Sequence, residues 1–188
     1  MTFNFEDVKN DFDRRMQGAV EVLRQEFSGL RSGRANTALL DPITVEAYGS
    51  PMPLNQIATI NIPEPRALSI QVWDSNLVKA AEKAILDSGL GLNPSTEGQL
   101  IRIAIPSLTE ERRQELTKVA AKYAEDARIA IRNIRRHSMD QLKKNEKDGN
   151  ISKDALHEYS QEVQRVTDNF INLVDEALSN KNREITQV

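Results

Sequence analysis

The sequence predicts an α+β protein in which a small β/α domain is inserted into a bundle of three long helices. Three observations lead to this fold class. The stretch from Thr109 to Lys147 contains neither glycine nor proline and keeps helical periodicity along its length. Similar amphipathic stretches occur near both ends of the chain. All seven prolines run from Pro42 to Pro106, so a differently folded segment separates the first long helix from the second.

The first helix is predicted to begin near Phe5. Its apolar residues recur at steps of three and four, which places them on one face of a helix. These residues are Phe5, Val8, Phe12, Met16, Ala19, Leu23, Phe27 and Leu30. We expect the helix to end near Gly33, because glycine readily adopts the left-handed conformation of a C-terminal cap.

The segment 34–106 is predicted to form the inserted β/α domain. Its apolar runs predict strands at 43–48, 59–62, 68–73 and 100–105. Residues 76–87 predict a short helix, and the Gly49-Ser-Pro sequence predicts a turn. We expect Tyr48 and Trp73 to belong to the core of this domain and not to a surface on which bases stack.

Two long helices follow the insert. The first of them, up to Lys147, would extend roughly 60 Å at 1.5 Å per residue, so other helices must lie beside it. Its predicted apolar stripe comprises Leu116, Val119, Tyr123, Ala127, Ala130, Ile134, Ser138 and Leu142. Asp148-Gly149-Asn150 ends this helix, and Ser152 can cap the last one. The short turn requires the two helices to be antiparallel.

The three-helix bundle is thus predicted to comprise residues 1–33 and 107–188, and the insert to comprise residues 34–106. The bundle closes its apolar stripes within one chain, so a monomer is expected. Only two backbone connections join the two domains, and a joint of this kind can flex. The residues predicted to form this hinge are Gly33, Arg34, Ala35, Ile105, Pro106 and Ser107.

Composition excludes several classes of function. The chain has 188 residues, of which 39% are hydrophobic, and this is enough to build a globular core. It contains no cysteine, which rules out disulfides, thiol catalysis and cysteine-based metal sites. No apolar run is long enough to span a bilayer, and the N-terminus lacks a secretory signal, so we expect a cytoplasmic protein without a membrane partner.

Catalytic patterns are also missing from the sequence. The two histidines, His137 and His157, have no partner at metal-ligand spacing. No glycine-rich loop opens a helix, and no nucleophile is paired with a base. We therefore expect no enzymatic activity, no metal and no cofactor.

The strongest functional signal is a cluster of cations on the long middle helix. The net charge of the chain is −3, which taken alone argues against a nucleic-acid partner, yet residues 108–150 hold 11 basic and 8 acidic residues. At 100° per residue, five cations share one face. We call this set the arginine face: Arg128, Arg132, Arg135, Arg136 and Lys143. Because guanidinium groups bind phosphate through two parallel hydrogen bonds, the face suits a polyanion.

Other interpretations of these cations remain open. Charged residues on a long helix usually form a solvated surface, and the same face could bind an acidic protein, which would make the chain a helical adaptor. Arg31 and Arg34 form a second, weaker basic cluster. Because they lie at the joint, they could equally be structural anchors.

Five motifs give the sequence a resemblance to a known family, the bacterial ribosome recycling factors. In order along the chain they are Leu30-Arg-Ser-Gly-Arg-Ala, Tyr48-Gly-Ser-Pro-Met-Pro-Leu, Gly91-Leu-Asn-Pro, Leu108-Thr-Glu-Glu-Arg-Arg and Arg132-Asn-Ile-Arg-Arg. Each motif is weak alone, but together they cover essentially the whole chain. One departure is Lys153, in the first turn of the last helix, where similar proteins more often carry an acid.

The resemblance implies an L-shaped, two-domain molecule of roughly transfer-RNA dimensions. Such factors act after termination, when elongation factor G and its GTP hydrolysis split the ribosome into subunits. The resemblance further implies that the bundle lies on large-subunit ribosomal RNA and that Arg132, Arg135 and Arg136 contact it. Arg31 and Arg34 match a basic pair near the hinge.

Overall fold

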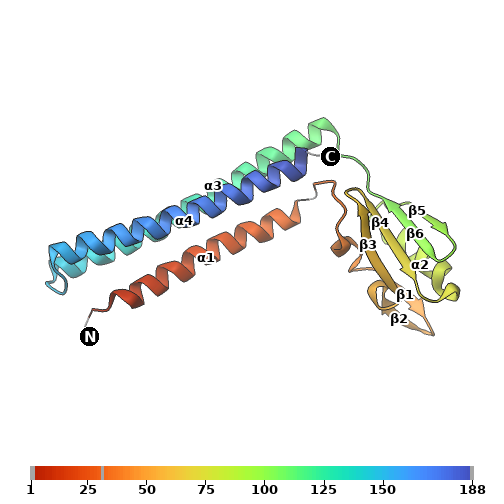
Figure 1. The fold of residues 1–188 in the computed structure, drawn as a ribbon, viewed down its shortest axis with the longest axis horizontal. Helices are drawn as coiled ribbons and strands as arrows, with labels where there is room; N and C mark the ends of the chain where they lie inside the picture. Colours follow the sequence, from red (N-terminus) through yellow and green to blue (C-terminus); the bar gives the residue numbers. More distant parts are fainter. Residues whose placement is uncertain (1–2, 31, 187–188) are drawn as a thin grey trace. The chain divides into compact units, whose positions relative to one another are not determined.

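The computed structural model describes residues 3–30 and 32–186, which form two compact units (Figure 1). One unit contains the three long helices, α1 (Phe5–Gly29), α3 (Glu110–Lys147) and α4 (Lys153–Thr186). The other is the segment Ser32–Glu110, which holds the strands and the short helix α2 (Val78–Leu86). The predicted α+β class, with a helical bundle and a small inserted β/α domain, is confirmed.

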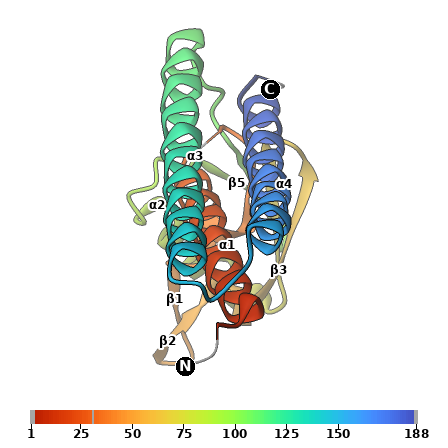
Figure 2. The ribbon, with the colours of Figure 1, turned by 90° about the vertical axis from the view of Figure 1, so that its left-hand side faces the viewer.

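The three helices of the first unit lie side by side in both views (Figures 1 and 2). As predicted, α3 and α4 are antiparallel and joined by a tight turn, in which Gly149 has a φ of 78°. The Ser152 hydroxyl accepts a hydrogen bond of 3.0 Å from the backbone N–H of Ala155, so Ser152 caps α4 as expected. No helix of the described residues is both long and apolar enough to cross a membrane.

The buried face of α3 is wider than the predicted stripe. Ala120, Ala124 and Ile131 are buried although they lie outside that stripe. Three of its predicted members are only half-buried, namely Val119, Tyr123 and Ala130. A helix in a three-helix bundle faces two neighbours, so a single line of apolar residues underestimates the surface that it buries.

Helix α1 ends four residues before the predicted cap. Its last residue is Gly29, and Leu30 is already extended, with its N–H bonded to the Phe27 carbonyl at 3.1 Å. The Leu30 carbonyl is held by Lys181 of α4, whose ammonium lies 3.0 Å away. Gly33 has the expected positive φ of 77°, but it lies in the following loop, where a Cβ would stand 3.2 Å from Cγ of Leu108. The prediction that Gly33 caps the helix was therefore wrong.

The second unit contains two antiparallel sheets. A hairpin pairs β1 (Thr44–Ala47) with β2 (Ser50–Pro53). The four-stranded sheet has the order β3-β4-β6-β5, formed by Ala58–Glu64, Ala67–Val72, Leu100–Ala104 and Pro94–Glu97. Short 3-10 turns occur at Thr37–Leu40, Leu54–Gln56 and Ser75–Leu77.

The core of this unit is built from alternate residues of its central strands. Leu68 pairs with Ile103 and Ile70 with Ile101 across β4 and β6, and all four side chains are fully buried. Helix α2 adds its buried residues to the same cluster, among them Ile85. The alternation is that expected for an antiparallel sheet with one covered face.

Two strands were missed by the sequence pattern. β2 occupies part of the predicted turn and contains Pro51 and Pro53, while β5 begins at Pro94. Proline cannot donate to a strand ladder, so it disfavours a central strand but is compatible with an edge strand. Both missed strands are indeed edges of their sheets.

The expectation that Tyr48 and Trp73 lie in the core was also wrong. Tyr48 is 74% exposed and Trp73 59% exposed. The Tyr48 hydroxyl donates to the Asp74 carboxylate at 2.6 Å, and the Trp73 indole N–H donates to the Thr59 hydroxyl at 2.9 Å. These polar partners lie at the domain surface and keep both rings there.

Candidate nucleic-acid interface

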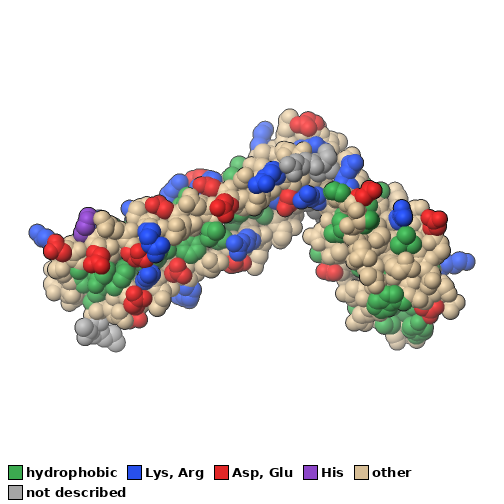
Figure 3. Space-filling model, viewed as in Figure 1, with side chains coloured by type: hydrophobic (Ala, Val, Ile, Leu, Met, Phe, Trp, Pro, Cys, Tyr) green, Lys and Arg blue, Asp and Glu red, His purple; other side chains and the backbone are tan. Residues whose placement is uncertain are grey.

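All five members of the predicted arginine face are on α3, which carries them without a break because no residue of the helix is glycine or proline. Arg132, Arg136 and Lys143 are exposed, whereas Arg128 and Arg135 are half-buried. The space-filling view shows basic side chains along the helical unit with acidic ones between them (Figure 3). The function of the face therefore depends on how each cation is paired.

Arg128 links α3 to α4 through hydrogen bonds. Its Nε and Nη2 donate to the same Asp175 carboxylate oxygen of α4, at 3.0 and 2.7 Å, and its Nη1 lies 3.0 Å from Glu125. The hydrogen bond to Asp175 is the main cause that raises the pKa of Arg128 above its ordinary value. With its side chain only 20% exposed and two acids bound, Arg128 is poorly placed to meet a phosphate.

Arg132 is partly neutralised. Its Nη1 lies 3.1 Å from the other carboxylate oxygen of Glu125, which is seven residues earlier on α3. The hydrogen bonds from Arg128 and then Arg132 lower the pKa of Glu125, so this carboxylate is charged at neutral pH. The Arg132 side chain is 57% exposed and stays accessible from solvent.

The C-terminal half of the face carries uncompensated charge. Arg135 Nε donates to the neutral amide oxygen of Gln164 at 2.7 Å, and Gln164 is itself held by Asp168 at 2.8 Å. Within residues 3–30 and 32–186, no acid lies in ion-pair distance of Arg135, Arg136 or Lys143. Three positive charges therefore remain available on one stretch of helix.

This arrangement can bind a run of anions. Arg135 is oriented through Nε, which leaves its two terminal nitrogens as donors for an oxyanion. Arg136 and Lys143 are exposed and can adjust to the spacing of successive phosphates. The half of the face around Arg135 is thus better suited to a phosphate backbone than the half around Arg128.

Of the second basic cluster, Arg31 lies outside the described residues. Arg34 is exposed, in the loop that follows α1. The structure therefore places only one member of this pair, and it places that member in the strand-containing unit.

Two of the six predicted hinge residues are tied to the turn between β3 and β4. The N–H of Ala35 donates to the Pro65 carbonyl at 2.7 Å, and the N–H of Ile105 donates to the Arg66 carbonyl at 2.8 Å. Both bonds lie within the strand-containing unit. Gly33 is buried in that unit, while Arg34, Pro106 and Ser107 are exposed.

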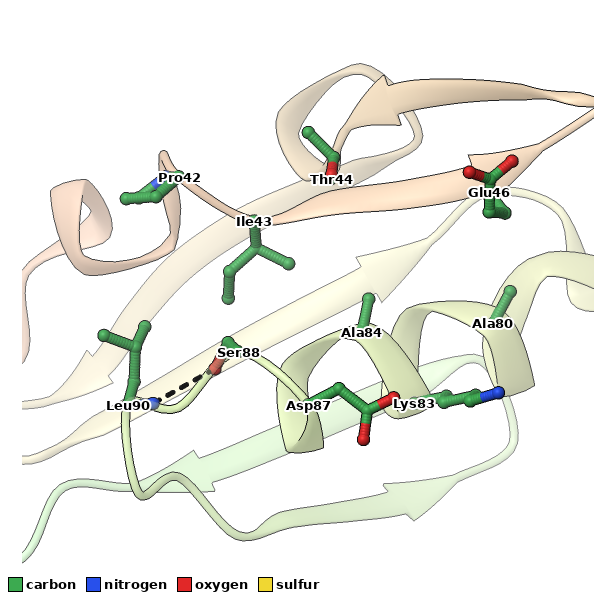
Figure 4. Close-up of a pocket in the computed structure, with 10 residues that line it drawn as sticks. All are labelled: Pro42, Ile43, Thr44, Glu46, Ala80, Lys83, Ala84, Asp87, Ser88 and Leu90. Carbon is green, nitrogen blue, oxygen red and sulfur yellow. Dashed lines mark hydrogen bonds between the residues drawn. The ribbon is translucent and has the colours of Figure 1, made fainter.

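The strand-containing unit also has an open pocket of about 450 Å³ between β1 and α2 (Figure 4). Its walls combine apolar residues with Glu46, Lys83 and Asp87. Of the two hydroxyl residues that line it, Thr44 and Ser88, the Ser88 hydroxyl donates to the Ile85 carbonyl at 2.6 Å and accepts from the N–H of Leu90. Ser88 is thus occupied in closing the helix and is not poised as a nucleophile.

Metal binding has no structural support in the described part of the chain, because no three histidine or carboxylate side chains there are grouped to hold an ion.

The partners of the arginine face were missed at the level of sequence. Asp175 and Gln164 follow their arginines by 47 and 29 residues, so only the register of α3 against α4 brings them together. Glu125 could have been found, because it precedes Arg128 by one helical turn.

Comparison with known proteins agrees with the motifs. The family described as ribosome recycling factor matches residues 23–186. The ribosome-recycling factor of Rhodospirillum centenum is 60% identical over 97% of this chain and 98% of its own length. That of Xanthobacter autotrophicus is 59% identical over 100% of this chain and 98% of its own.

Solved structures give the same result. A solution structure of ribosome recycling factor has a TM-score of 0.72 and 40% identity, and the match covers both chains completely. A second is the T. thermophilus ribosome recycling factor, described together with E. coli elongation factor G bound to the E. coli post-termination complex. It has a TM-score of 0.63 and 48% identity, covering 98% of this chain and 99% of its own. The fold, the motifs and these full-length matches show that the chain belongs to the ribosome recycling factor family.

Proposed function

We propose that this protein binds the post-termination ribosome through its helical bundle and that elongation factor G, hydrolysing GTP, then acts with it to split the ribosome into subunits. The observation that supports this most strongly is the full-length match to ribosome recycling factors, one of them described with elongation factor G on a post-termination complex. The protein itself needs no catalytic group, since the GTP is hydrolysed by its partner. It would work in the cytoplasm, where ribosomes translate.

The ribosomal contact that we propose is between α3 and large-subunit ribosomal RNA. Arg135, Arg136 and Lys143 carry charge that no described acid neutralises. Ribosomal RNA presents phosphates at regular spacing, and a row of cations along one helix meets several of them in one orientation. Arg132 extends this contact toward the N-terminal end of the helix, and the basic residues Arg31 and Arg34 would add to it near the joint.

The inserted domain is proposed to receive the push from elongation factor G. It is connected to the bundle by two stretches of backbone, one after α1 and one before α3. Because Ala35 and Ile105 are hydrogen-bonded inside the insert, we infer that bending occurs on the bundle side of these two residues. The RNA contact on α3 can then persist while the insert moves.

Co-sedimentation with ribosomes on sucrose gradients tests the binding step. Arg135→Ala should weaken binding by about 1.5 to 3 kcal/mol, because a charge-assisted contact to phosphate is lost. The dependence of log K on log salt should flatten by about one unit per phosphate contact removed. The fold should be unaffected, since alanine is the best helix former.

A second measurement, of activity, completes this test. Subunit splitting by elongation factor G and GTP should decline in parallel with binding when Arg135 and Arg136 are replaced. Wild-type binding and an unchanged salt slope in that double variant would contradict the RNA interface. Binding that survives nuclease digestion of the RNA would instead favour the adaptor alternative, in which the same face meets an acidic protein.

A further inference from the structure

The Glu125 carboxylate lies between two members of the arginine face. One oxygen is 3.0 Å from Nη1 of Arg128, and the other is 3.1 Å from Nη1 of Arg132. Each oxygen therefore serves a different guanidinium. An acid in this position offers Arg132 the same kind of partner, a charged oxygen, that a phosphate would offer.

The two arginines differ in their freedom to leave this acid. Arg128 has a side chain that is 20% exposed, and Asp175 holds it through two further hydrogen bonds. Arg132 is 57% exposed, and Glu125 is its only ion-pair partner in the described part of the chain. Arg132 can therefore turn toward another anion by giving up one ion pair, while Arg128 would also have to break its two hydrogen bonds to Asp175.

The fixed arginine also fixes the acid. Arg128 binds Asp175 and Glu125 together, so that Glu125 is held beside Arg132 even after Arg132 turns away. A phosphate that approaches Arg132 must then displace this carboxylate and remain near its negative charge. Both effects oppose binding, because like charges at short range repel.

We propose that Glu125 is an internal competitor of the ribosomal RNA phosphate for Arg132, and that it limits the affinity of the bundle for the large subunit. The inference rests on the proposed function, because it requires the arginine face to meet RNA. A limited affinity favours release of the protein from the large subunit, and a factor that acts on many ribosomes in turn must leave each one. Exposed ion pairs contribute modestly, so loss of the competitor should tighten binding by about two- to fivefold.

The test is a set of variants of the full chain, titrated against purified large ribosomal subunits at fixed salt. Glu125→Gln keeps the length of the side chain and its helix propensity but removes the charge. It is combined with Arg132→Ala in a double-mutant cycle. The matched control is Glu21→Gln, which removes an equally exposed acid from a Glu–Arg pair, with Arg24 at 2.8 Å, on α1.

We expect Glu125→Gln to tighten binding, Glu21→Gln to leave it unchanged, and Arg132→Ala to abolish the gain. Equal tightening by both glutamate variants would overturn it, because the effect would then be one of net charge. Tightening that persists in the Arg132→Ala background would overturn it as well, and so would an Arg132→Ala variant that binds like wild type while Arg135→Ala binds weakly. Wild-type binding by both arginine variants is a separate result, which would contradict the RNA interface itself.

Discussion

The ammonium group of Lys181 lies 3.0 Å from the carbonyl oxygen of Leu30, directly after the end of α1. Lys181 is on α4 and is only 8% exposed, with Glu184 at 3.4 Å as its acid partner. The last turn of α1 has no cation of its own. A residue distant in sequence thus supplies both the hydrogen bond and the positive charge that stabilise a helix C-terminus.

We expect Lys181→Met to lower the free energy of unfolding by about 1 to 3 kcal/mol, because the Leu30 carbonyl loses its donor while most of the packing is kept. Urea denaturation followed by circular dichroism measures this. Lys147→Met, in the exposed last turn of α3, is the control and should change stability by no more than about 0.5 kcal/mol. Equal effects of the two variants would show that the contact to Leu30 contributes nothing specific.

Arg128 should behave as a structural residue. Arg128→Ala removes two hydrogen bonds to Asp175 and one to Glu125 and should destabilise the bundle by about 1 to 3 kcal/mol. Asp175→Asn should have a similar effect, and the double variant should be less destabilised than the sum of the two. Urea denaturation followed by circular dichroism measures these changes. Arg136→Ala should leave the free energy of unfolding nearly unchanged. A loss of stability as large as that of Arg128→Ala would contradict the conclusion that Arg128 is structural and Arg136 is not.

Gly33 is expected to tolerate substitution less well than Gly49. Both have a positive φ, 77° and 79°, which is unfavourable by about 1 to 2 kcal/mol for an L-residue. Only at Gly33 would a Cβ press on a neighbour, at 3.2 Å from Cγ of Leu108, whereas nothing lies within 4 Å at Gly49. Gly33→Ala should therefore destabilise the strand-containing unit more than Gly49→Ala does.

The fluorescence of Trp73, the only tryptophan of the chain, reports the unfolding of this unit. Leu108→Ala should recover part of the loss caused by Gly33→Ala and should do nothing for Gly49→Ala. If the two glycine variants are equally stable, the close approach of Leu108 has no energetic consequence.

The lowered pKa of Glu162 predicts that the bundle loses part of its stability in acid. The hydrogen bond from Arg165, at 2.6 Å, and then that from Lys9 of α1, at 3.0 Å, lower the pKa of Glu162 from 4.5 to about 2. Because the folded pKa lies below the unfolded one, the stabilisation is present above pH 4.5 and is lost as the pH falls toward 2.

Urea unfolding at several pH values between 6 and 2 checks this. Glu162→Gln should be less stable than wild type at pH 6, and the difference should shrink steadily below pH 4.5. Glu21→Gln, whose pair with Arg24 lies within a single helix, is the control and should show a smaller difference at pH 6. A difference for Glu162→Gln that stays constant over the whole range would contradict the role of its ionisation.

The long helices could be predicted because their signal is local. The region from Thr109 to Lys147 lacks glycine and proline, and the spacing of its apolar residues identifies the helix and part of its buried face without knowledge of the partner. The end of α1 could not be predicted, because Gly33 is a plausible cap by type and the residue that holds Leu30 comes from α4. Local propensity thus identified the elements, and tertiary contacts determined where they stop.

Tertiary contacts also limited what could be predicted of the arginine face. The five cations share a helix and could be found by angle alone, but their charges are unequal after folding. Arg128 is neutralised by Asp175, and Arg135 meets only the neutral Gln164. Similarly, aromatic residues usually lie inside a small domain, so residue type alone predicts a core position for Tyr48 and Trp73. Thr59 comes close to Trp73 only when β3 pairs with β4, and Asp74 comes close to Tyr48 only in the folded domain.

The prolines in the edge strands of the four-stranded sheet have a consequence for the nascent chain. The ribosome synthesises α1 long before α3 and α4, so the insert is the first part of the protein that can complete its own core. At that stage the sheet has formed but α1 still has no helix to pack against. Both edges of the four-stranded sheet carry a proline, Pro63 in β3 and Pro94 in β5, and neither residue can donate to an incoming strand. The newly made insert is thereby protected against edge-to-edge aggregation while the helix before it waits for its partners.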